Sequence, residues 1–270
     1  MATVTDIQDY ADASGNVIVG KPRACVSSFI EFAASNCRVE ISDGVSFRNA
    51  KIKMTADNGL LRIGSRSTIK NTIRVGLDSS VIIGKRLSCT GSGILSAAEG
   101  TSVTIGDDCM FSVSFDIRSD HAHPIFDRST GKRVNKSKSL VVGNHVWLGP
   151  QALIYPGAHV GDGSVIGARS LVSGIVPPHC IAVGVPARVT RRNIVWDKTH
   201  VCSKAPWRFN DLDDLGHIPW QSAVADIEPL PAIERRRTLR DWFNGIFAAA
   251  GCALIQIAPI PDIADRFASL

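Results

Sequence analysis

Residues 142–172 read VGNHVW LGPQAL IYPGAH VGDGSV IGARSL V, and this stretch decides the fold. An aliphatic residue opens every group of six, and a small or β-branched residue follows four places later in the first five groups. The aliphatic residues are Val142, Leu148, Ile154, Val160, Ile166 and Val172, and the small or β-branched ones are Val146, Ala152, Ala158, Ser164 and Ser170. A period of six fits neither the 3.6 of a helix nor the two of a strand. It indicates a short strand and a tight corner, three of which close a triangular coil that stacks on the next.

The same period recurs upstream, with extra residues between runs of three. These upstream positions are Ile63, Ile69, Val75, Ile83, Cys89, Leu95, Ile105, Phe111 and Ile117. Glycine directly follows four of the aliphatic residues in 142–172, where we expect it to relax the backbone at the corner. The pattern therefore predicts an all-β parallel β-helix of hexapeptide repeats over residues 38–192. A loop at 118–141 interrupts it, residues 1–37 lead into it, and 193–270 form a C-terminal extension with a helix near 233–257.

Composition excludes several classes of function. The net charge of +5 over 270 residues is mild, and the basic residues form no long run, so we expect no nucleic-acid partner. The seven cysteines have no paired spacing, which favours buried, reduced thiols in a cytoplasmic protein and no metal site. The apolar run 246–260 is too short for a membrane span and is interrupted, so we interpret it as a packed helix.

The interruption carries the residues that suggest chemistry. Residues 118–139 read RSDHAHPIFDRSTGKRVNKSKS and hold two histidines, two aspartates and six basic residues. Function tends to lie on loops that a rigid scaffold positions. A histidine is suited to remove a proton from a hydroxyl, because its pKa lies near neutrality, and a carboxylate on its other nitrogen would orient the ring. The basic residues favour an anionic partner as readily as a solvated loop.

The repeats, together with HPIFD at 123–127, HVWLG at 145–149 and IAVGVPARV at 181–189, resemble the hexapeptide-repeat acyltransferase family. The resemblance covers about residues 40–192, and it is strongest to bacterial sugar and capsular-polysaccharide O-acetyltransferases. It implies a left-handed β-helix, acetyl-CoA as acyl donor, a saccharide acceptor and a homotrimer with sites at the subunit interfaces.

The resemblance also implies roles for single residues. His123 matches the family's base and His121 is the alternative; Asp127 or Asp120 would orient the imidazole. Trp147 would lie beside the active site. The positions implied for acetyl-CoA are Gly149, Gly167, Ala168, Arg169, Ser173 and Arg188.

The sequence therefore predicts an O-acetyltransferase that uses direct transfer with a histidine base and without a metal. Three alternatives stay open at this stage. They are an N-acetyltransferase of an amino-sugar or antibiotic-like acceptor, a γ-carbonic-anhydrase-like enzyme, and a non-catalytic β-helix protein. The carbonic-anhydrase chemistry needs three histidines around zinc, and the spacing of two of them in similar proteins is missing here.

Overall fold

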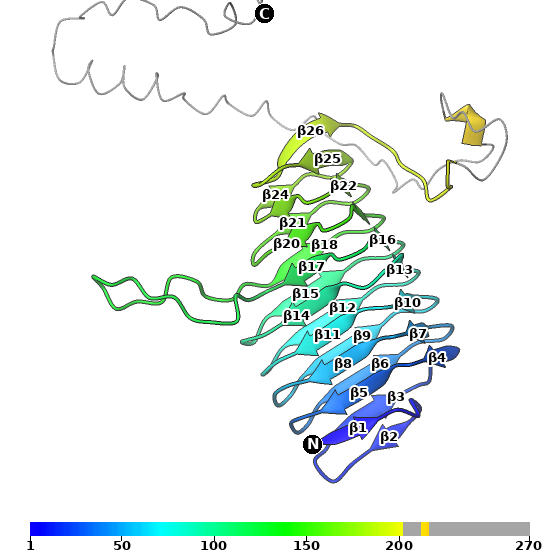
Figure 1. The fold of residues 1–270 in the computed structure, drawn as a ribbon, viewed down its shortest axis with the longest axis vertical. Coiled ribbons are helices and arrows are strands. Elements are labelled where there is room, and N and C mark those ends of the chain that lie inside the picture. Colours follow the sequence, from blue (N-terminus) through cyan, green and yellow to red (C-terminus); the bar gives the residue numbers. More distant parts are fainter. Residues whose placement is uncertain (202–211, 216–270) are drawn as a thin grey trace, which may run out of the picture. The chain divides into compact units, whose positions relative to one another are not determined.

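The chain folds into a solenoid of stacked coils (Figure 1). The computed structural model describes residues 1–201 and 212–215, and all structural statements below concern this part of the chain. Successive coils contribute one strand to each of three faces. Outside the solenoid lies one 3-10 helix, η1 (Asp213–Leu215). The predicted helix near 233–257 lies outside the described residues.

Face A is the eight-stranded sheet. In spatial order it contains β1 (Ala2–Val4), β5 (Phe29–Phe32), β8 (Lys51–Met54), β11 (Thr72–Val75), β14 (Ile94–Ala97), β17 (Asp116–Arg118), β20 (Leu153–Ile154) and β23 (Leu171–Val172).

Face B is the nine-stranded sheet. It contains β2 (Tyr10–Ala11), β3 (Val17–Val19), β6 (Arg38–Ile41), β9 (Leu60–Ile63), β12 (Ser80–Ile83), β15 (Ser102–Ile105), β18 (Leu140–Val142), β21 (His159–Val160) and β24 (Ile175–Val176).

Face C consists of a three-stranded and a six-stranded sheet that follow one another. The first contains β4 (Ala24–Val26), β7 (Ser46–Arg48) and β10 (Thr68–Ile69). The second contains β13 (Ser88–Cys89), β16 (Met110–Phe111), β19 (Trp147–Leu148), β22 (Val165–Ile166), β25 (Cys180–Val183) and β26 (Arg188–Arg192).

Strands pair in parallel from coil to coil, and their register follows the hexads. Val142 pairs with Val160 on face B, which lies three hexads along the chain. The aliphatic residues of every predicted hexad point into the prism and are at most 3% exposed. The small residues Ala152, Ser164 and Ser170 are equally buried at the interior corners. The prediction of an all-β parallel β-helix is thus confirmed.

The glycines that follow the aliphatic residues serve a different purpose from the predicted one. Gly143 and Gly161 do not adopt positive φ; positive φ occurs two places further on, for example at His145. A Cβ on Gly143 would lie 2.2 Å from Asp162 Oδ1, and one on Gly161 would lie 2.4 Å from Pro178 N. The next coil therefore leaves no room for a side chain, and close stacking is the reason for glycine.

The solenoid begins earlier than predicted. β3, β4 and β5 already form parallel pairs with β6, β7 and β8, so the first coil starts at Val17 rather than at residue 38. The period was obscured because this coil points Ile18 and Ile30 inward but has the exposed Cys25 on its face C strand. Cys25 also departs from the expectation of buried thiols, which holds for Cys37, Cys89, Cys109 and Cys180.

Antiparallel strands cover part of each end of the stack. β1 pairs antiparallel with β5 and β2 with β3 at the first coil. β26 pairs antiparallel with β25 at the last coil, after a turn that contains the cis Val185–Pro186 bond. Residues 193–201, here called the strap, then return over face C.

Candidate active site

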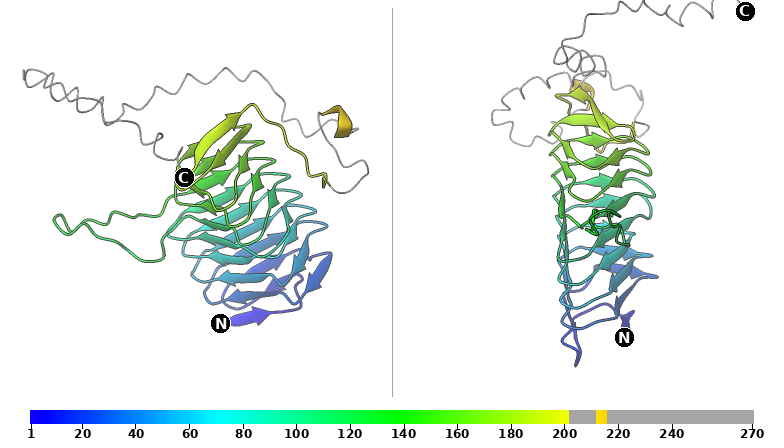
Figure 2. Two further views of the ribbon diagram at one scale, coloured as in Figure 1. Left: turned by 45° about the horizontal axis from the view of Figure 1, so that its top comes forward. Right: turned by 90° about the vertical axis from the view of Figure 1, so that its left-hand side faces the viewer.

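The predicted loop is an arm that projects from the edge between faces A and B. It comprises residues 119–139, because β17 ends at Arg118 and β18 begins at Leu140. Its neck is closed by Lys138 N, which donates to Ser119 O at 2.9 Å. The green arm stands away from the coils in Figure 1 and in the left view of Figure 2. The coils above and below continue in register across this insertion.

The arm is a narrow hairpin with a built turn at its tip. Val134 N donates to Ile125 O, and Asp127 N donates to Lys132 O, both at 2.8 Å. Asp127 Oδ1 accepts hydrogen bonds from the hydroxyl and backbone N–H groups of Ser129 and Thr130. The Ser129 hydroxyl and these further donors lower the pKa of Asp127 to about 2.

This geometry corrects the expected role of Asp127. Its carboxylate organises the tip of the hairpin and makes no contact with either histidine ring in the described part of the chain. The turn needs an acceptor for the N–H groups two and three residues further along the chain, and the aspartate side chain supplies it.

The two histidines of the arm have different surroundings. Both are exposed. His121 packs edge-on against Tyr155 of the next coil, with ring centroids 5.8 Å apart. His123 lies one step further out, just before Pro124, and its ring forms no hydrogen bond with residues 1–201 or 212–215. His123 is therefore the freer of the two to meet a ligand.

Asp120 lies at the base of the arm and is 7% exposed. Its Oδ1 accepts from Ala122 N at 2.8 Å, and its Oδ2 accepts from the Ser96 hydroxyl at 3.2 Å. This carboxylate shapes the chain where it leaves the solenoid, so it also does not orient an imidazole within the described residues.

Glu99, at the edge of the preceding coil, ties the arm to the solenoid. Its two carboxylate oxygens accept hydrogen bonds from Arg133 Nη1 and from the Ser137 hydroxyl, each at 2.5 Å. These donors, Arg133 first, lower the pKa of Glu99 to about 2. The six-residue period does not indicate this contact, because the contact joins a corner residue to a loop residue.

Trp147 lies on the opposite side of the prism, on β19 of face C. Its indole Nε1 is buried and has no hydrogen-bond partner in the described part of the chain. The strap covers it from one side, since the Trp147 and Trp196 ring centroids are 5.7 Å apart. A buried donor without a partner is costly, and a ligand could satisfy it.

The strap is held by a buried polar network around His145. The His145 ring stacks on Trp196 with centroids 4.0 Å apart. Its Nδ1 lies 2.8 Å from Asp108 Oδ2 and its Nε2 lies 3.0 Å from Trp196 O. Lys198 also donates to Asp108, at 2.9 Å. The His145 ring is thus held between the Asp108 carboxylate and the strap backbone.

Asp108 is the acidic centre of this network. Burial raises its pKa, but hydrogen bonds from Lys198 and His145 outweigh burial, and the pKa lies below its usual value. His145 is therefore a structural residue that docks the strap. The contact joins His145 to Trp196, 51 residues further along the chain, so the six-residue period does not indicate it.

A groove of about 690 Å³ opens between the strap and face C. Its floor is formed by outward side chains of three successive coils, Trp147, Val165 and Ile181. The remaining lining residues come from β26, the strap and the short segment around η1: Arg191, Asn193, Ile194, Val195, Trp196, Asp197, Thr199, Val201, Leu212 and Leu215.

The residues predicted to contact acetyl-CoA do not form one cluster. Ala168 and Arg169 are exposed at the edge between faces C and A, where Arg169 Nε donates to Gln151 at 2.7 Å. Ser173 is exposed at the other edge of face A, the one that carries the arm. Arg188 is exposed at the start of β26.

The two predicted glycines are not open to a ligand in the way expected. Gly149 is buried, and a Cβ there would lie 2.8 Å from Ala168 N of the next coil. A Cβ on Gly167 would lie 2.6 Å from Val183 Cγ1. Coil stacking, as at Gly143, accounts for both.

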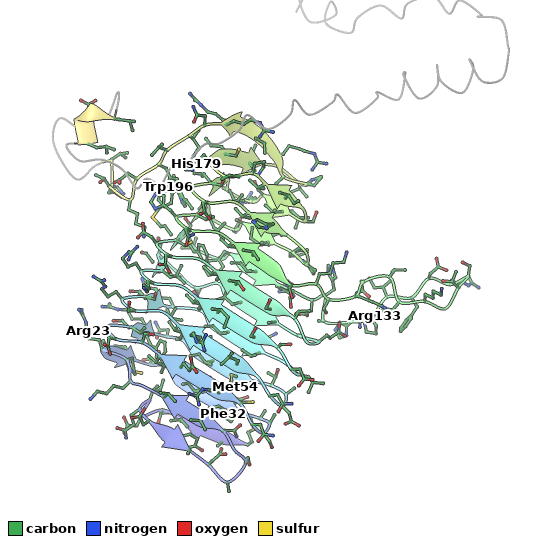
Figure 3. The ribbon with its side chains drawn as sticks, turned by 180° about the vertical axis from the view of Figure 1, so that it is seen from behind. Arg23, Phe32, Met54, Arg133, His179 and Trp196 are labelled. Carbon is green, nitrogen blue, oxygen red and sulfur yellow. The ribbon has the colours of Figure 1, made fainter. Side chains whose placement is uncertain are left out.

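Within one protomer, the arm and the groove lie on different sides of the prism. Figure 3 shows Arg133 on the arm and Trp196 on the far side of the stack. His123 and Trp147 are therefore not brought together by a single chain.

Residues 1–201 and 212–215 contain no group of three or more His, Cys, Asp or Glu side chains placed to hold a metal ion. No helix in this part of the chain is both long and apolar enough to cross a membrane.

Comparison with known proteins places the fold in a family. Residues 139–174 match the model described as bacterial transferase hexapeptide (six repeats). The crystal structure of the polySia-specific acetyltransferase NeuO is 34% identical, with a TM-score of 0.62 and coverage of 72% of this chain and 91% of that one. The chain belongs to the hexapeptide-repeat transferase family, as the sequence motifs predicted.

Two curated relatives of the chain carry the names of O-acetyltransferases. The polysialic acid O-acetyltransferase of Escherichia coli O1:K1 is 38% identical over 139 residues, which are 52% of this chain and 45% of that protein. The galactoside O-acetyltransferase of Escherichia coli K12 is 31% identical over 48% of this chain and 62% of its own length. The matched part of the chain thus spans about half the length of these relatives.

Proposed function

We propose that this protein is an acetyl-CoA-dependent O-acetyltransferase that acts on a hydroxyl of a saccharide, with His123 as general base. The observation that carries the proposal is the arm, which presents an exposed histidine from a hexapeptide-repeat solenoid. The names of the relatives, which include O-acetyltransferases of polysialic acid and of galactosides, support the reaction class.

The residues of the chain have suitable chemistry for this transfer. Acetyl-CoA supplies a thioester whose carbonyl carbon is open to attack and whose thiolate can leave. His123 accepts the proton of the acceptor hydroxyl as its oxygen attacks, and later returns a proton to the leaving thiolate. The products are an acetyl ester and free CoA, so the imidazole ends the cycle neutral.

The fit to the acyl donor rests on the groove and on two exposed arginines of the solenoid. The buried indole N–H of Trp147 lacks a partner and can donate to an amide carbonyl of the pantetheine or to a sugar hydroxyl. Arg169 and Arg188 are exposed and can meet phosphates.

The separation of His123 and Trp147 within one protomer supports an active site that two neighbouring subunits share. We propose that the protein assembles as a homotrimer in which the arm of one subunit reaches the groove side of its neighbour. This arrangement combines two halves of a site that one protomer keeps apart.

An anionic saccharide suits the charge of the arm. Arg133 is paired with Glu99, but the other predicted basic residues of the arm are exposed; they are Arg128, Lys132, Lys136 and Lys138. We place the reaction in the cytoplasm, where acetyl-CoA and the reduced state of the buried thiols are both expected.

The test is an acetyl-transfer assay with acetyl-CoA and a panel of saccharides that includes oligosialic acid, neutral galactosides and amino-sugars. We expect an ester product on a sialic acid or related acidic sugar, and His123→Ala should lower kcat by about 10²- to 10⁴-fold. His159→Ala, an exposed histidine outside the arm, is the matched control and should keep normal turnover.

Each result has a defined meaning. If His121→Ala abolishes turnover while His123→Ala keeps it, His121 is the base. An amide product would replace O-transfer by N-transfer. If neither variant loses activity, the histidine mechanism is wrong.

A further inference from the structure

The returning half of the arm has two distinct faces. Arg133, Asn135 and Ser137 are half-buried, whereas Lys132, Val134 and Lys136, which alternate with them, are exposed. Alternation with a period of two is typical of an extended strand. One face of this extended segment is therefore directed at the outgoing half of the arm and at Glu99. That face consists of polar side chains.

Asn135 makes two hydrogen bonds that enclose Pro124. Its Nδ2 donates to His123 O at 2.8 Å, and its Oδ1 accepts from Ile125 N at 2.7 Å. Pro124 has no N–H, so the backbone at this point cannot continue a regular ladder. The side-chain amide of Asn135 replaces the missing backbone partner on both sides of the proline, and it thereby fixes the peptide of His123.

Arg133 in turn holds Asn135. Arg133 Nε lies 3.3 Å from Asn135 Oδ1, and Nη2 lies 3.3 Å from Asn135 O. The third guanidinium nitrogen, Nη1, pairs with Glu99. Glu99 lies in the tight corner between β14 and β15, with φ of 56°, and belongs to the rigid stack of coils. A continuous set of polar contacts thus leads from the solenoid to His123.

We propose that Asn135 is a positioning residue for His123, and that Arg133 and Glu99 fix it to the solenoid. The inference rests on the proposed function, in which His123 is the base. A general base must lie within hydrogen-bonding reach of the proton that it removes. Misplacement by about 1 Å can lower a rate by about 10²-fold, so an arm that carries the base needs such a constraint.

The decisive variant is Asn135→Asp in the full-length protein. It keeps the shape of the side chain and the acceptor for Ile125 N, but it loses the donor to His123 O. We expect kcat to fall by about 10- to 100-fold, with the KM for acetyl-CoA changed by less than about twofold. Asn135→Ala should behave similarly, and Arg133→Lys should fall between Asn135→Asp and the wild type.

Val134→Ala is the matched control, because this neighbouring side chain is 63% exposed. It should leave kcat unchanged. A second readout is the NMR spectrum of the His123 ring: its resonances should shift in Asn135→Asp but not in Val134→Ala. A merely structural role of Asn135 would lower thermal stability without this selective effect on kcat and on the ring.

Failure of this inference can be told apart from failure of the proposed function. If His123→Ala is inactive while Asn135→Asp keeps kcat within about twofold and an unshifted His123 spectrum, Asn135 does not position the base. If His123→Ala is active, the base assignment has failed, and the role of Asn135 falls with it.

Discussion

At the scale of single residues, two carboxylates of the arm region are committed to local hydrogen bonds. Asp127 shapes the tip and Glu99 receives Arg133 and Ser137, and the pKa of each is lowered to about 2. Neither is available to orient a histidine. The sequence placed Asp127 in the loop that interrupts the repeat, but spacing alone could not reveal that Ser129 and Thr130 would occupy its carboxylate.

The Glu99 contact gives a prediction on acid sensitivity. Its pKa is depressed from 4.5 to about 2, so the contact stabilises the arm fully above the unfolded value and weakens as the pH falls toward about 2. In a ¹³C NMR titration, the Glu99 carboxyl should titrate near 2 in the wild type and at a higher pH in Arg133→Gln, where only the Ser137 donors still lower its pKa. Titration near 4.5 in both proteins would mean that the ion pair does not form in solution.

At the scale of elements, the six-residue period predicted the coils but made no prediction for the contacts of the arm and the strap. The predicted inward positions from Ile63 to Val172 are all buried, because each one fills the same interior site of successive coils; other core residues of these strands, such as Ile73, Val81 and Val103, were not among the predicted positions. The arm and the strap carry no period. Their contacts join distant residues, such as His123 with Asn135 and His145 with Trp196, and these could not be read from spacing.

The strap gives a prediction at this scale. Because His145 stacks on Trp196 and bonds to its carbonyl, His145→Ala should release residues 193–201 from face C. Amide hydrogen exchange in 194–199 should rise strongly, whereas exchange in the arm should not change. Unaltered protection of the strap would indicate that its remaining contacts with the solenoid suffice to hold it.

At the scale of the whole molecule, the separation of His123 and Trp147 predicts complementation between subunits. His123→Ala and Trp147→Ala should each be nearly inactive alone. Co-expressed or refolded together, they should recover activity up to roughly a quarter of the wild type, since random mixing in a cyclic trimer restores about one site in four. No recovery from mixed trimers, with mixing verified by mass spectrometry, would place both residues in one subunit's site.

The antiparallel strands at both ends of the stack have a further consequence. An open end of a parallel β-helix exposes a row of unpaired N–H and C=O groups, which is a template for the addition of another chain. Here β1 and β2 cover faces A and B at the first coil, and β26 covers face C at the last, each running against the direction of the coils. These strands act as chain terminators of a one-dimensional polymer. The three ladders that they end cannot be extended there by a further parallel coil from another copy of the chain.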